Sequence, residues 1–514
     1  MPELGKKGFE DLVAACDAGT SGVRCALFDT KGNIAASAHR LWSYEPDPGA
    51  TGGLMFDPES AWNLMASVIC EAIDSGGIRP ARIRAVSVTS QRLGLVLVDI
   101  LGNGIKGIPN IDRRAVTQAA MVGEKWGKLV YSRAGRWPGP GHALNKLLWI
   151  KEYEPEIFNR TASVLSLGDW FALRMGGQVA TDPSSACETC LYDVVGGGWD
   201  PEISGATSVE ASILPKIIPC GSPVGQIGRK ISCMTGLPEG ALIVMGGGDT
   251  ECGVLGLGAR RAGDMAIIAG SSAPIECVVD SPIMDSEYRT LTNPFVIEGK
   301  WVVESNAMLT GSSYGWLVSM LSPPGASPNP SSRYADIERE IATTEIGAGG
   351  ALCYLGSSIM DSRRGNFPAV AGILAPMSAV NGRSLTRGHL GRAALEAEAY
   401  AIRANIEQLV QVTGFSSAVI LVGGGSLKSD AFRSILPDVL GIPVLSTDDE
   451  ATPRGCAMCA AAGAGYFGTL EEACASMAPR PAVLEPDIQR HVRYDLPYRR
   501  WLSGFGQIKA LDIK

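Results

Sequence analysis

Residues 242–272 constrain the fold of this chain more than any other stretch. An apolar run leads into three glycines and Asp249, and a second apolar run leads into the turn Gly270-Ser271-Ser272. Glycine allows a backbone to approach a ligand closely, and ligands of α/β sheets bind beyond the carboxyl ends of parallel strands. The segment therefore predicts an α/β fold in which Asp249 is a catalytic base and the turn 270–272 contacts a nucleotide phosphate.

The length of 514 residues predicts two domains of similar size, because a single hydrophobic core stops growing at roughly 250–300 residues. We expect these domains to comprise residues 1–256 and 257–514. Apolar residues make up 46% of the chain and charged residues 19%, which is typical of a globular protein. The net charge of −8 argues against a nucleic-acid partner, which usually requires a basic face.

Three patterns concern the location of the protein. No run of about 18 apolar residues is present, so we expect no membrane contact. The first residues, MPELGKKGFEDLV, lack the apolar core of a signal peptide, and the thirteen cysteines stand mostly in apolar surroundings, which indicates reduced thiols in a cytoplasmic protein. The C-x-x-C pairs Cys187/Cys190 and Cys456/Cys459 are interpreted as packing residues, with metal or redox chemistry as the alternative.

Two similar turns indicate a duplicated architecture. The strand-like run 12–16 is followed by a polar turn, 17–22, and by a second strand-like run, 23–27. The same order recurs where two apolar runs flank the turn 270–272. Hydroxyls and glycines at such tips present backbone N–H groups in a concave nest that suits phosphate oxygens. A plain β-turn is the alternative for either turn alone, because Gly and Ser favour turns.

Polar residues at other strand ends are candidates for ligand contacts. Gln91 and Arg92 follow the strand-like run 84–89, and an amide beside a guanidinium offers the directional hydrogen bonds that hydroxyl-rich ligands need. Surface-loop chemistry is the alternative for these two residues. The glycines 423–425 separate the run 418–422 from a helix, where they would let a purine or a phosphate lie on the backbone. A tight turn is the alternative there.

Seven motifs occur in the order found in one family. They are DAGTSGVRCALFD from Asp17, SQRLGLVLVDILG from Ser90, NKLLWIKEYEP from Asn145, GGGD ending at Asp249, HLGRAALE from His389, LVGGGSLKS from Leu421 and GIPV from Gly441. With them the chain resembles the FGGY carbohydrate kinases over most of its length. The resemblance implies two ribonuclease H-like (actin-like ATPase) domains with a cleft between them. It also implies Mg²⁺-dependent phosphoryl transfer from ATP to a small sugar, ketose, polyol or dihydroxypentanedione-type acceptor.

The resemblance implies roles for individual residues. Asp249 would accept the proton of the attacking hydroxyl, because phosphoryl transfer needs a positioned nucleophile and a proton acceptor. Asp17 and Asp249 would hold Mg²⁺, Asp17 through water. The nucleotide would be bound by Thr20, Ser21, Arg24, Gly270, Ser271, Ser272, Gly424, Gly425 and Ser429. The substrate would be bound by Gln91, Arg92, Asn110, Asp112 and Asp249.

Several details resemble the autoinducer-kinase branch, whose acceptor is dihydroxypentanedione. They are MFD at Met55, the residues Asn110 to Arg113, and NPFVIEGK at Asn293. Xylulokinases share parts of this pattern, so a xylulokinase or another pentulose kinase is the alternative. Glycerol and autoinducer kinases carry a substrate-binding glutamate where this chain has Leu93. A catalytically idle sugar sensor is the alternative of another class, since a fold alone does not prove chemistry. The acceptor and the oligomeric state, a homodimer included, stay open.

Overall fold

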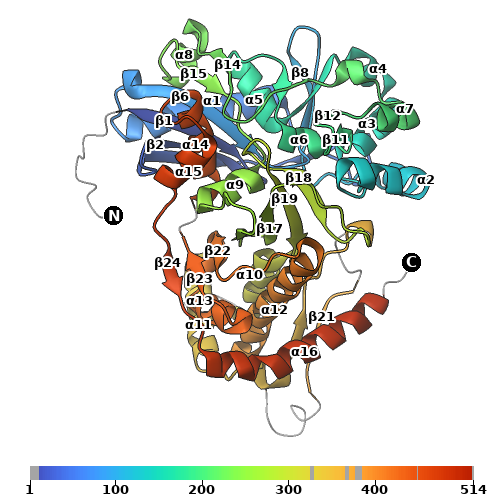
Figure 1. The fold of residues 1–514 in the computed structure, drawn as a ribbon, viewed down its shortest axis with the longest axis vertical. Helices are drawn as coiled ribbons and strands as arrows, with labels where there is room; N and C mark the ends of the chain where they lie inside the picture. Colours follow the sequence, from blue (N-terminus) through green and yellow to red (C-terminus); the bar gives the residue numbers. More distant parts are fainter. Residues whose placement is uncertain (1–10, 324–328, 365–369, 377–384, 448–449, 512–514) are drawn as a thin grey trace.

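The computed structural model describes residues 11–323, 329–364, 370–376, 385–447 and 450–511. Two mixed sheets form the two halves of the molecule, which lie one above the other in Figure 1. The upper half holds the strands of the first 250 residues, and the lower half holds the strands that follow. Each half is therefore built around a sheet of its own.

The first sheet has six strands. In spatial order they are β14 (Pro223–Gln226), β15 (Leu242–Val244), β6 (Ile83–Ser90), β1 (Leu12–Ala18), β2 (Gly22–Asp29) and β3 (Ile34–Leu41). β1, β2 and β3 form an antiparallel meander. On the other side of β1, β6 pairs with it in parallel, and β15 pairs in parallel with β6.

The second sheet repeats this arrangement. Its strands are β18 (Leu291–Pro294), β19 (Trp301–Asn306), β17 (Pro274–Val279), β16 (Met265–Ile268), β22 (Ile420–Gly423), β23 (Val444–Ser446) and β24 (Ala482–Leu484). β16, β17 and β19 form the antiparallel meander, and β22 and β23 continue from β16 in parallel. The predicted duplication of a ribonuclease H-like unit is therefore confirmed, while the domain boundary at residue 256 stays a prediction.

Helix α1 (Pro58–Ser75) shows how local sequence sets an element of the first half. Asp57 caps its N-terminus by accepting a hydrogen bond from the N–H of Ser60 (2.8 Å), and Pro58 occupies the first turn, where its missing N–H costs nothing. Trp62, Met65 and Ile69 recur at helical spacing and are buried against β2 and β3. The helix covers one face of the first sheet.

Helix α12 (Arg387–Thr413) is the central helix of the second half. Thr386 and His389 form its capping box, and Gly414, with a φ of +73°, ends it. Its neighbours are α10 (Thr310–Leu321), α11 (Pro330–Ala342), α13 (Asp430–Leu440) and α16 (Ile488–Ala510). Leu395, Ala399, Ile402, Ile406 and Leu409 recur at helical spacing, so the sequence predicts an amphipathic helix over 389–412, which the structure confirms to within two residues at each end.

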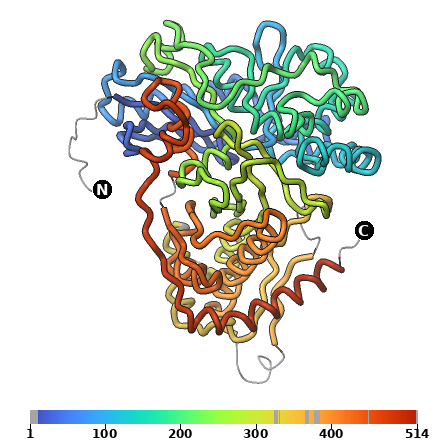
Figure 2. The backbone as a smooth tube through the Cα atoms, viewed as in Figure 1, coloured from blue at the N-terminus to red at the C-terminus, as the bar shows by residue number. Residues whose placement is uncertain are grey.

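Two helices cross closely between the sheets, α9 (Asp249–Leu257) and α14 (Ala451–Gly463). A Cβ at Gly455 would lie 1.8 Å from the carbonyl oxygen of Cys252, and one at Gly256 would lie 1.9 Å from that of Ala451. Only glycine allows the backbones to approach so closely. α14 and the following α15 (Leu470–Met477) pack on the first sheet, although they follow the strands of the second sheet in sequence, and Figure 2 shows the chain crossing back.

A smaller sheet extends the first half, with strands β7 (Leu95–Val98), β8 (Gly104–Ile108) and β9 (Ser163–Ser166). Around it lie α2 (Val116–Ala134), α3 (Ala143–Tyr153), α4 (Pro155–Arg160), α5 (Leu167–Met175), α6 (Pro183–Cys187) and α7 (Pro201–Thr207), whereas α8 (Arg229–Thr235) packs against α1. Short strand pairs are β4 (Glu45–Pro46) with β5 (Leu54–Met55), β10 (Ala180–Thr181) with β13 (Lys216–Ile217), β11 (Tyr192–Asp193) with β12 (Gly198–Trp199), and β20 (Leu352–Tyr354) with β21 (Gly372–Leu374). None of the helices in the described ranges combines the length and apolar character needed to cross a bilayer.

Candidate active site

Asp17 and Asp249 lie at strand ends of the first sheet. Asp17 is the last but one residue of β1, and Asp249 is the first residue of α9, which follows β15 through three glycines. β6 lies between the two strands and pairs in parallel with both. The carboxyl ends of these strands therefore meet at one edge of the sheet, the edge where α/β proteins bind ligands.

The glycines before Asp249 are required by close packing on β6. A Cβ at Gly246 would lie 2.0 Å from the carbonyl oxygen of Val88. The Thr89 hydroxyl donates to the carbonyl of Gly247 (2.8 Å), which ties the glycine run to β6. The run is therefore held flat against the end of β6, and it delivers Asp249 to the sheet edge.

The surroundings of Asp17 and Asp249 favour the binding of a cation between their carboxylates. Burial raises the pKa of Asp17 to about 7, and the charge of Asp249 adds to this shift while Arg24 opposes it. Burial also raises the pKa of Asp249, against the opposing charge of Arg92. Within the described residues, Asp17 Oδ1 is buried without a hydrogen-bond partner. Two carboxylates with an unsatisfied oxygen fit Mg²⁺, which takes hard oxygen ligands.

The turn between β1 and β2 carries two of the predicted phosphate contacts, and β2 carries a third. Thr20 and Ser21 are exposed at its tip. Thr20 Oγ1 accepts a hydrogen bond from Asn110 Nδ2 (2.8 Å), so a predicted nucleotide contact and a predicted substrate contact meet here. Arg24, on β2, forms an ion pair with Glu450, which directly precedes α14. A phosphate contact by Arg24 stays a prediction, and the phosphate would compete with Glu450.

The turn between β16 and β17 is bound to the N-terminus of α10. Within the turn, the N–H of Gly270 donates to the carbonyl of Ser272 (2.9 Å). The N–H groups of Gly311 and Ser312 donate to the carbonyls of Gly270 and Ser271, both at 3.2 Å. A Cβ at Gly311 would lie 2.4 Å from the Gly270 carbonyl oxygen, so glycine is required at this contact. The first residues of α10 therefore fix the turn.

The glycine loop after β22 lies against the same turn. Gly424 has a φ of +114°, and a Cβ there would lie 2.5 Å from the carbonyl oxygen of Ala269. At Gly425 a Cβ would meet no atom of the described residues within 4 Å, so the loop has an open face. Ser429 caps α13, and its hydroxyl also donates to Glu338 Oε1 (2.6 Å). The structure thus brings together the predicted nucleotide residues of the second half.

Two predicted substrate residues, Gln91 and Asp112, form hydrogen bonds to other residues of the first half. Gln91 is buried, its Nε2 donates to the Tyr44 hydroxyl (2.8 Å), and its Oε1 accepts from the N–H of Asn110 (3.4 Å). Asp112 is fully buried, where it accepts hydrogen bonds from the backbone of β5 (2.6 Å) and from Arg114 Nε (3.1 Å). These bonds give Asp112 a structural role, and a substrate contact by Asp112 stays a prediction.

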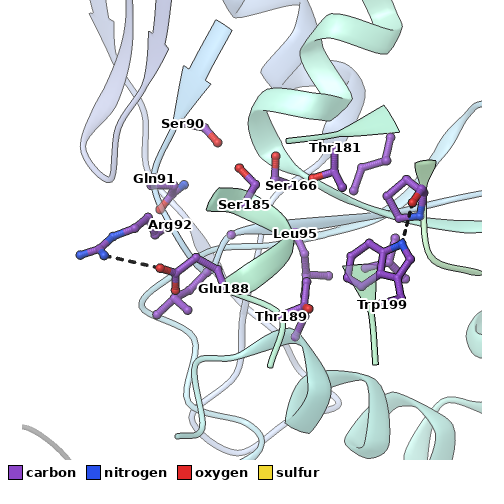
Figure 3. A pocket seen from close by; sticks show the side chains of 16 residues that line it. Ser90, Gln91, Arg92, Leu95, Ser166, Thr181, Ser185, Glu188, Thr189 and Trp199 are labelled. Atoms are coloured by element: carbon purple, nitrogen blue, oxygen red, sulfur yellow. Dashed lines mark hydrogen bonds and ion pairs between the residues drawn. The ribbon is translucent and has the colours of Figure 1, made fainter. Parts of the chain in front are cut away.

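Arg92 lies among four carboxylates. It contacts both oxygens of Glu304, with Nη1–Oε2 at 2.5 Å and Nη2–Oε1 at 3.2 Å. Glu188 and Glu251 lie 3.4 and 3.8 Å from Nη1, and the Asp249 carboxylate lies 4.0 Å from Nε. Figure 3 shows the bond to Glu188. Because Glu304 stands on β19, Arg92 joins the two halves of the molecule beside Asp249.

The three glutamates around Arg92 were not predicted from the sequence. Glu251 follows Asp249 by two residues, and this short spacing could have identified Glu251 as a candidate site residue. Glu188 and Glu304 stand 96 and 212 residues from Arg92, with no local pattern that links them to it.

Lys146 holds two of the loops that carry predicted substrate residues. It is fully buried on α3, where its Nζ donates to the carbonyls of Leu93 (2.8 Å) and Pro109 (3.1 Å). Burial lowers its pKa to about 7, and the charge of Asp112 opposes that shift. Leu93 has a φ of +69°, an uncommon conformation for a residue with a side chain. Lys146 thus stabilises the loop that follows Arg92.

A pocket lined by apolar and hydroxyl side chains lies beside the same loop (Figure 3). Its labelled hydroxyl side chains are those of Ser90, Ser166, Thr181, Ser185 and Thr189. Trp199 bounds another side and donates from Nε1 to the carbonyl of Pro215 (2.8 Å). Asp249 does not line this pocket, which therefore adjoins the carboxylate edge without including it.

Comparison with known proteins places this geometry in context. The FGGY family of carbohydrate kinases, N-terminal domain, matches residues 12–256, and its C-terminal domain matches residues 265–464. An Autoinducer-2 kinase from Yersinia enterocolitica is 29% identical over 511 residues, which cover 98% of this chain and 96% of that protein.

Solved structures agree on the fold. A ligand-bound xylulose kinase from Lactobacillus acidophilus has a TM-score of 0.85 at 19% identity, covering 98% of this chain and 99% of that one. A gluconate kinase from the same organism has a TM-score of 0.84 at 18% identity, with the same coverage. The two are named for different substrates, so the fold does not select an acceptor. The motif order, the duplicated sheets and the family matches agree, and the chain belongs to the FGGY family of carbohydrate kinases.

Proposed function

We propose that this carbohydrate kinase transfers the γ-phosphoryl group of ATP to a hydroxyl of a small sugar, ketose, polyol or dihydroxypentanedione-type acceptor. The match to an Autoinducer-2 kinase over nearly the whole chain supports an autoinducer-kinase-like acceptor. The observation that carries the proposed chemistry is the pair Asp17 and Asp249 at one sheet edge, both with a raised pKa and one with an unsatisfied buried oxygen.

Asp249 is the proposed general base. The acceptor oxygen forms a bond to the γ-phosphorus while the bond from that phosphorus to the leaving ADP oxygen breaks, and the hydroxyl proton passes to Asp249. A raised pKa makes Asp249 a stronger base than an ordinary aspartate, which suits proton transfer near neutral pH. Arg92, 4.0 Å away, opposes this shift because its positive charge favours the ionised carboxylate.

Asp17 and Asp249 are the proposed holders of Mg²⁺. The bound ion supplies positive charge that offsets the charge of the phosphate oxygens. The phosphates would lie between the two turns, and the purine would lie on the open face at Gly425. The nucleotide residues in this proposal are Thr20, Ser21, Arg24, Gly270, Ser271, Ser272, Gly424, Gly425 and Ser429. The acceptor would be bound by Gln91, Arg92, Asn110 and Asp112 together with Asp249.

A pentulose kinase, xylulokinase in particular, is the second candidate within the same chemistry. The motifs that this chain shares with xylulokinases support this candidate, whereas the likeness to a xylulose kinase structure concerns the fold alone. A catalytically idle sensor is the candidate of another class. We also propose that the reaction takes place in the cytoplasm, because the thirteen cysteines are free thiols, as a reducing compartment would keep them.

An ATP-to-ADP assay over pentuloses, polyols and dihydroxypentanedione tests the proposal. We expect ADP release that depends on one class of acceptor. Release with xylulose but not with dihydroxypentanedione would favour the pentulose alternative. Binding of ADP without turnover on any acceptor would favour the sensor.

The substitution Asp249→Asn tests the role of the base. The amide cannot accept the hydroxyl proton, so we expect kcat to fall by about 10²–10⁴ while ATP binding persists. Asp280→Asn is the control, because Asp280 is an exposed aspartate paired with Lys300 on the surface. Steady-state kinetics and titration calorimetry measure the two effects, and near-normal turnover of Asp249→Asn would refute the assignment.

A further inference from the structure

We propose that Glu338 is a positioning residue for the nucleotide, which joins the two helices that flank the glycine loop after β22. This inference rests on the proposed ATP site. Glu338 stands on α11, outside every motif recognised in the sequence. Its role would be to hold α10 and α13 at a fixed separation, so that the turn 270–272 and the loop at Gly424 and Gly425 are ready for ATP.

The contacts of the Glu338 carboxylate carry this inference. Oε1 accepts hydrogen bonds from the Ser429 hydroxyl (2.6 Å) and from the Tyr314 hydroxyl (3.1 Å). Oε2 accepts from the backbone N–H of Ala431 (3.1 Å). Tyr314 belongs to α10, whereas Ser429 and Ala431 form the N-terminus of α13. One carboxylate on a third helix therefore binds both flanking helices.

Each flanking helix is in turn attached to a predicted nucleotide contact. The N-terminus of α10 donates two hydrogen bonds to the turn 270–272. The N-terminus of α13 follows the loop that carries Gly424 and Gly425, whose face is open within the described part of the chain. A change in the separation of α10 and α13 would move the turn and the loop apart. We therefore expect the affinity for ATP to fall while the rate of the chemical step stays unchanged.

A second contact between α10 and α11 adds to the argument. A Cβ at Gly315 would lie only 2.7 Å from the Tyr334 hydroxyl oxygen, and the ring centroids of Tyr314 and Tyr334 lie 5.7 Å apart. Two tyrosines thus pack α11 against α10, and Glu338 lies where these two helices contact α13. The carboxylate is half-buried, so its hydrogen bonds are partly shielded from competing water.

Three variants test the role of Glu338. Glu338→Ala removes the acceptor for all three hydrogen bonds, and we expect KM for ATP to rise about tenfold with kcat and KM for the acceptor within about twofold. Glu338→Gln keeps one oxygen that can accept from Ser429 and Tyr314, and we expect a rise of about threefold. Asp336→Asn changes an exposed carboxylate on the same helix and should leave every constant unchanged.

The pattern of constants decides the outcome. A selective, graded rise in KM for ATP supports the inference, and calorimetric titration with ADP should show the same order of affinities. Equal changes in KM for ATP and for the acceptor, or no change in either, would overturn it. If Glu338→Ala does not fold, the result with Glu338→Gln decides alone. A wild-type protein that binds neither ATP nor ADP would refute the proposed function itself, and the inference with it.

Discussion

At the residue scale, Arg92 and its neighbour Leu93 have different roles in the site. The guanidinium of Arg92 is held by Glu304, Glu188 and Glu251, so the position of this cation is fixed by the protein. Leu93 directly follows it with a strained backbone and a carbonyl bound by Lys146. Because Leu93 stands where related kinases carry a substrate-binding glutamate, its side chain is our candidate for the departure in acceptor choice.

The substitution Leu93→Glu should change acceptor preference. A carboxylate at this position can accept hydrogen bonds from acceptor hydroxyls, so we expect ratios of kcat/KM across a ketose and polyol panel to shift by about tenfold. Leu93→Met is the matched control, because it keeps the size and the apolar character of the side chain under the same backbone strain. Unchanged ratios in Leu93→Glu would remove position 93 from the list of specificity residues.

At this scale the sequence predicted residues but few of their partners. Asp17 and Asp249 could be assigned because glycines and strand-like runs mark strand ends, and the structure brings both to one edge. The ion pair of Arg24 with Glu450 and the glutamates around Arg92 could not be predicted. These contacts join segments that lie far apart in the chain, so they depend on tertiary packing, which leaves no local pattern.

At the scale of elements, the crossing of α9 and α14 controls where Asp249 lies. Asp249 is the first residue of α9, and its backbone carbonyl accepts a hydrogen bond from Thr452 of α14 (3.2 Å). Gly455 allows α14 to lie directly on the carbonyl of Cys252, one turn further along α9. The position of the proposed base is therefore linked to a contact between two backbones.

The substitution Gly455→Ala should disturb both stability and turnover. The added methyl group would overlap the Cys252 carbonyl, so we expect the free energy of unfolding to fall by about 1–3 kcal/mol. A displaced α9 should also lower kcat by about tenfold or more, since small misplacements of reacting groups are costly. Thermal unfolding and steady-state kinetics measure these effects.

Gly205→Ala on α7 is the control for Gly455→Ala. A Cβ at Gly205 would meet no described atom within 4 Å, and alanine favours a helix over glycine. This variant should be as stable as the wild type or slightly more stable. Equal behaviour of the two alanine variants would contradict the role of the close crossing.

Long helices were predictable at this scale because their signals are local. α1 and α12 have apolar residues at helical spacing, and from that spacing the sequence predicts helices over 58–75 and 389–412, close to the observed bounds. The small residues of 455–467 predict a closely packed helix, which the structure shows as α14 (Ala451–Gly463). These small residues indicate that another backbone segment packs closely against the helix, but they do not identify that segment.

At the scale of the whole molecule, Arg136 is a buried link between the halves. Its Nη1 lies 2.6 Å from Glu188 of the first half, and its Nη2 donates to Asn293 of β18 in the second. Burial alone would raise the pKa of Glu188, but the charges of Arg136 and Arg92 hold it at about 2. Glu188 is therefore ionised and depends on both arginines.

The substitution Arg136→Met should lower the free energy of unfolding by about 3–5 kcal/mol, because it leaves the buried Glu188 carboxylate without its nearest cation. Arg40→Met is the matched control, since Arg40 is half-exposed and pairs with Glu71, which is also partly exposed. We expect its effect to stay below about 1 kcal/mol. Urea unfolding followed by tryptophan fluorescence measures both, and equal losses would contradict the proposed link.

The packing of α14 and α15 on the first sheet has a consequence for synthesis. The face of that sheet that carries Val13, Ala15, Phe28, Ala85 and Val244 is covered in the finished molecule by α9, α14 and α15, of which only α14 and α15 are synthesised long after the sheet. Roughly 230 residues separate β15 from the end of α15. At about 5–20 residues per second, a ribosome needs roughly 10–50 s to supply that cover. During this interval the nascent chain carries an exposed apolar face, so we expect its yield in cells to depend on chaperones that shield such surfaces until translation ends.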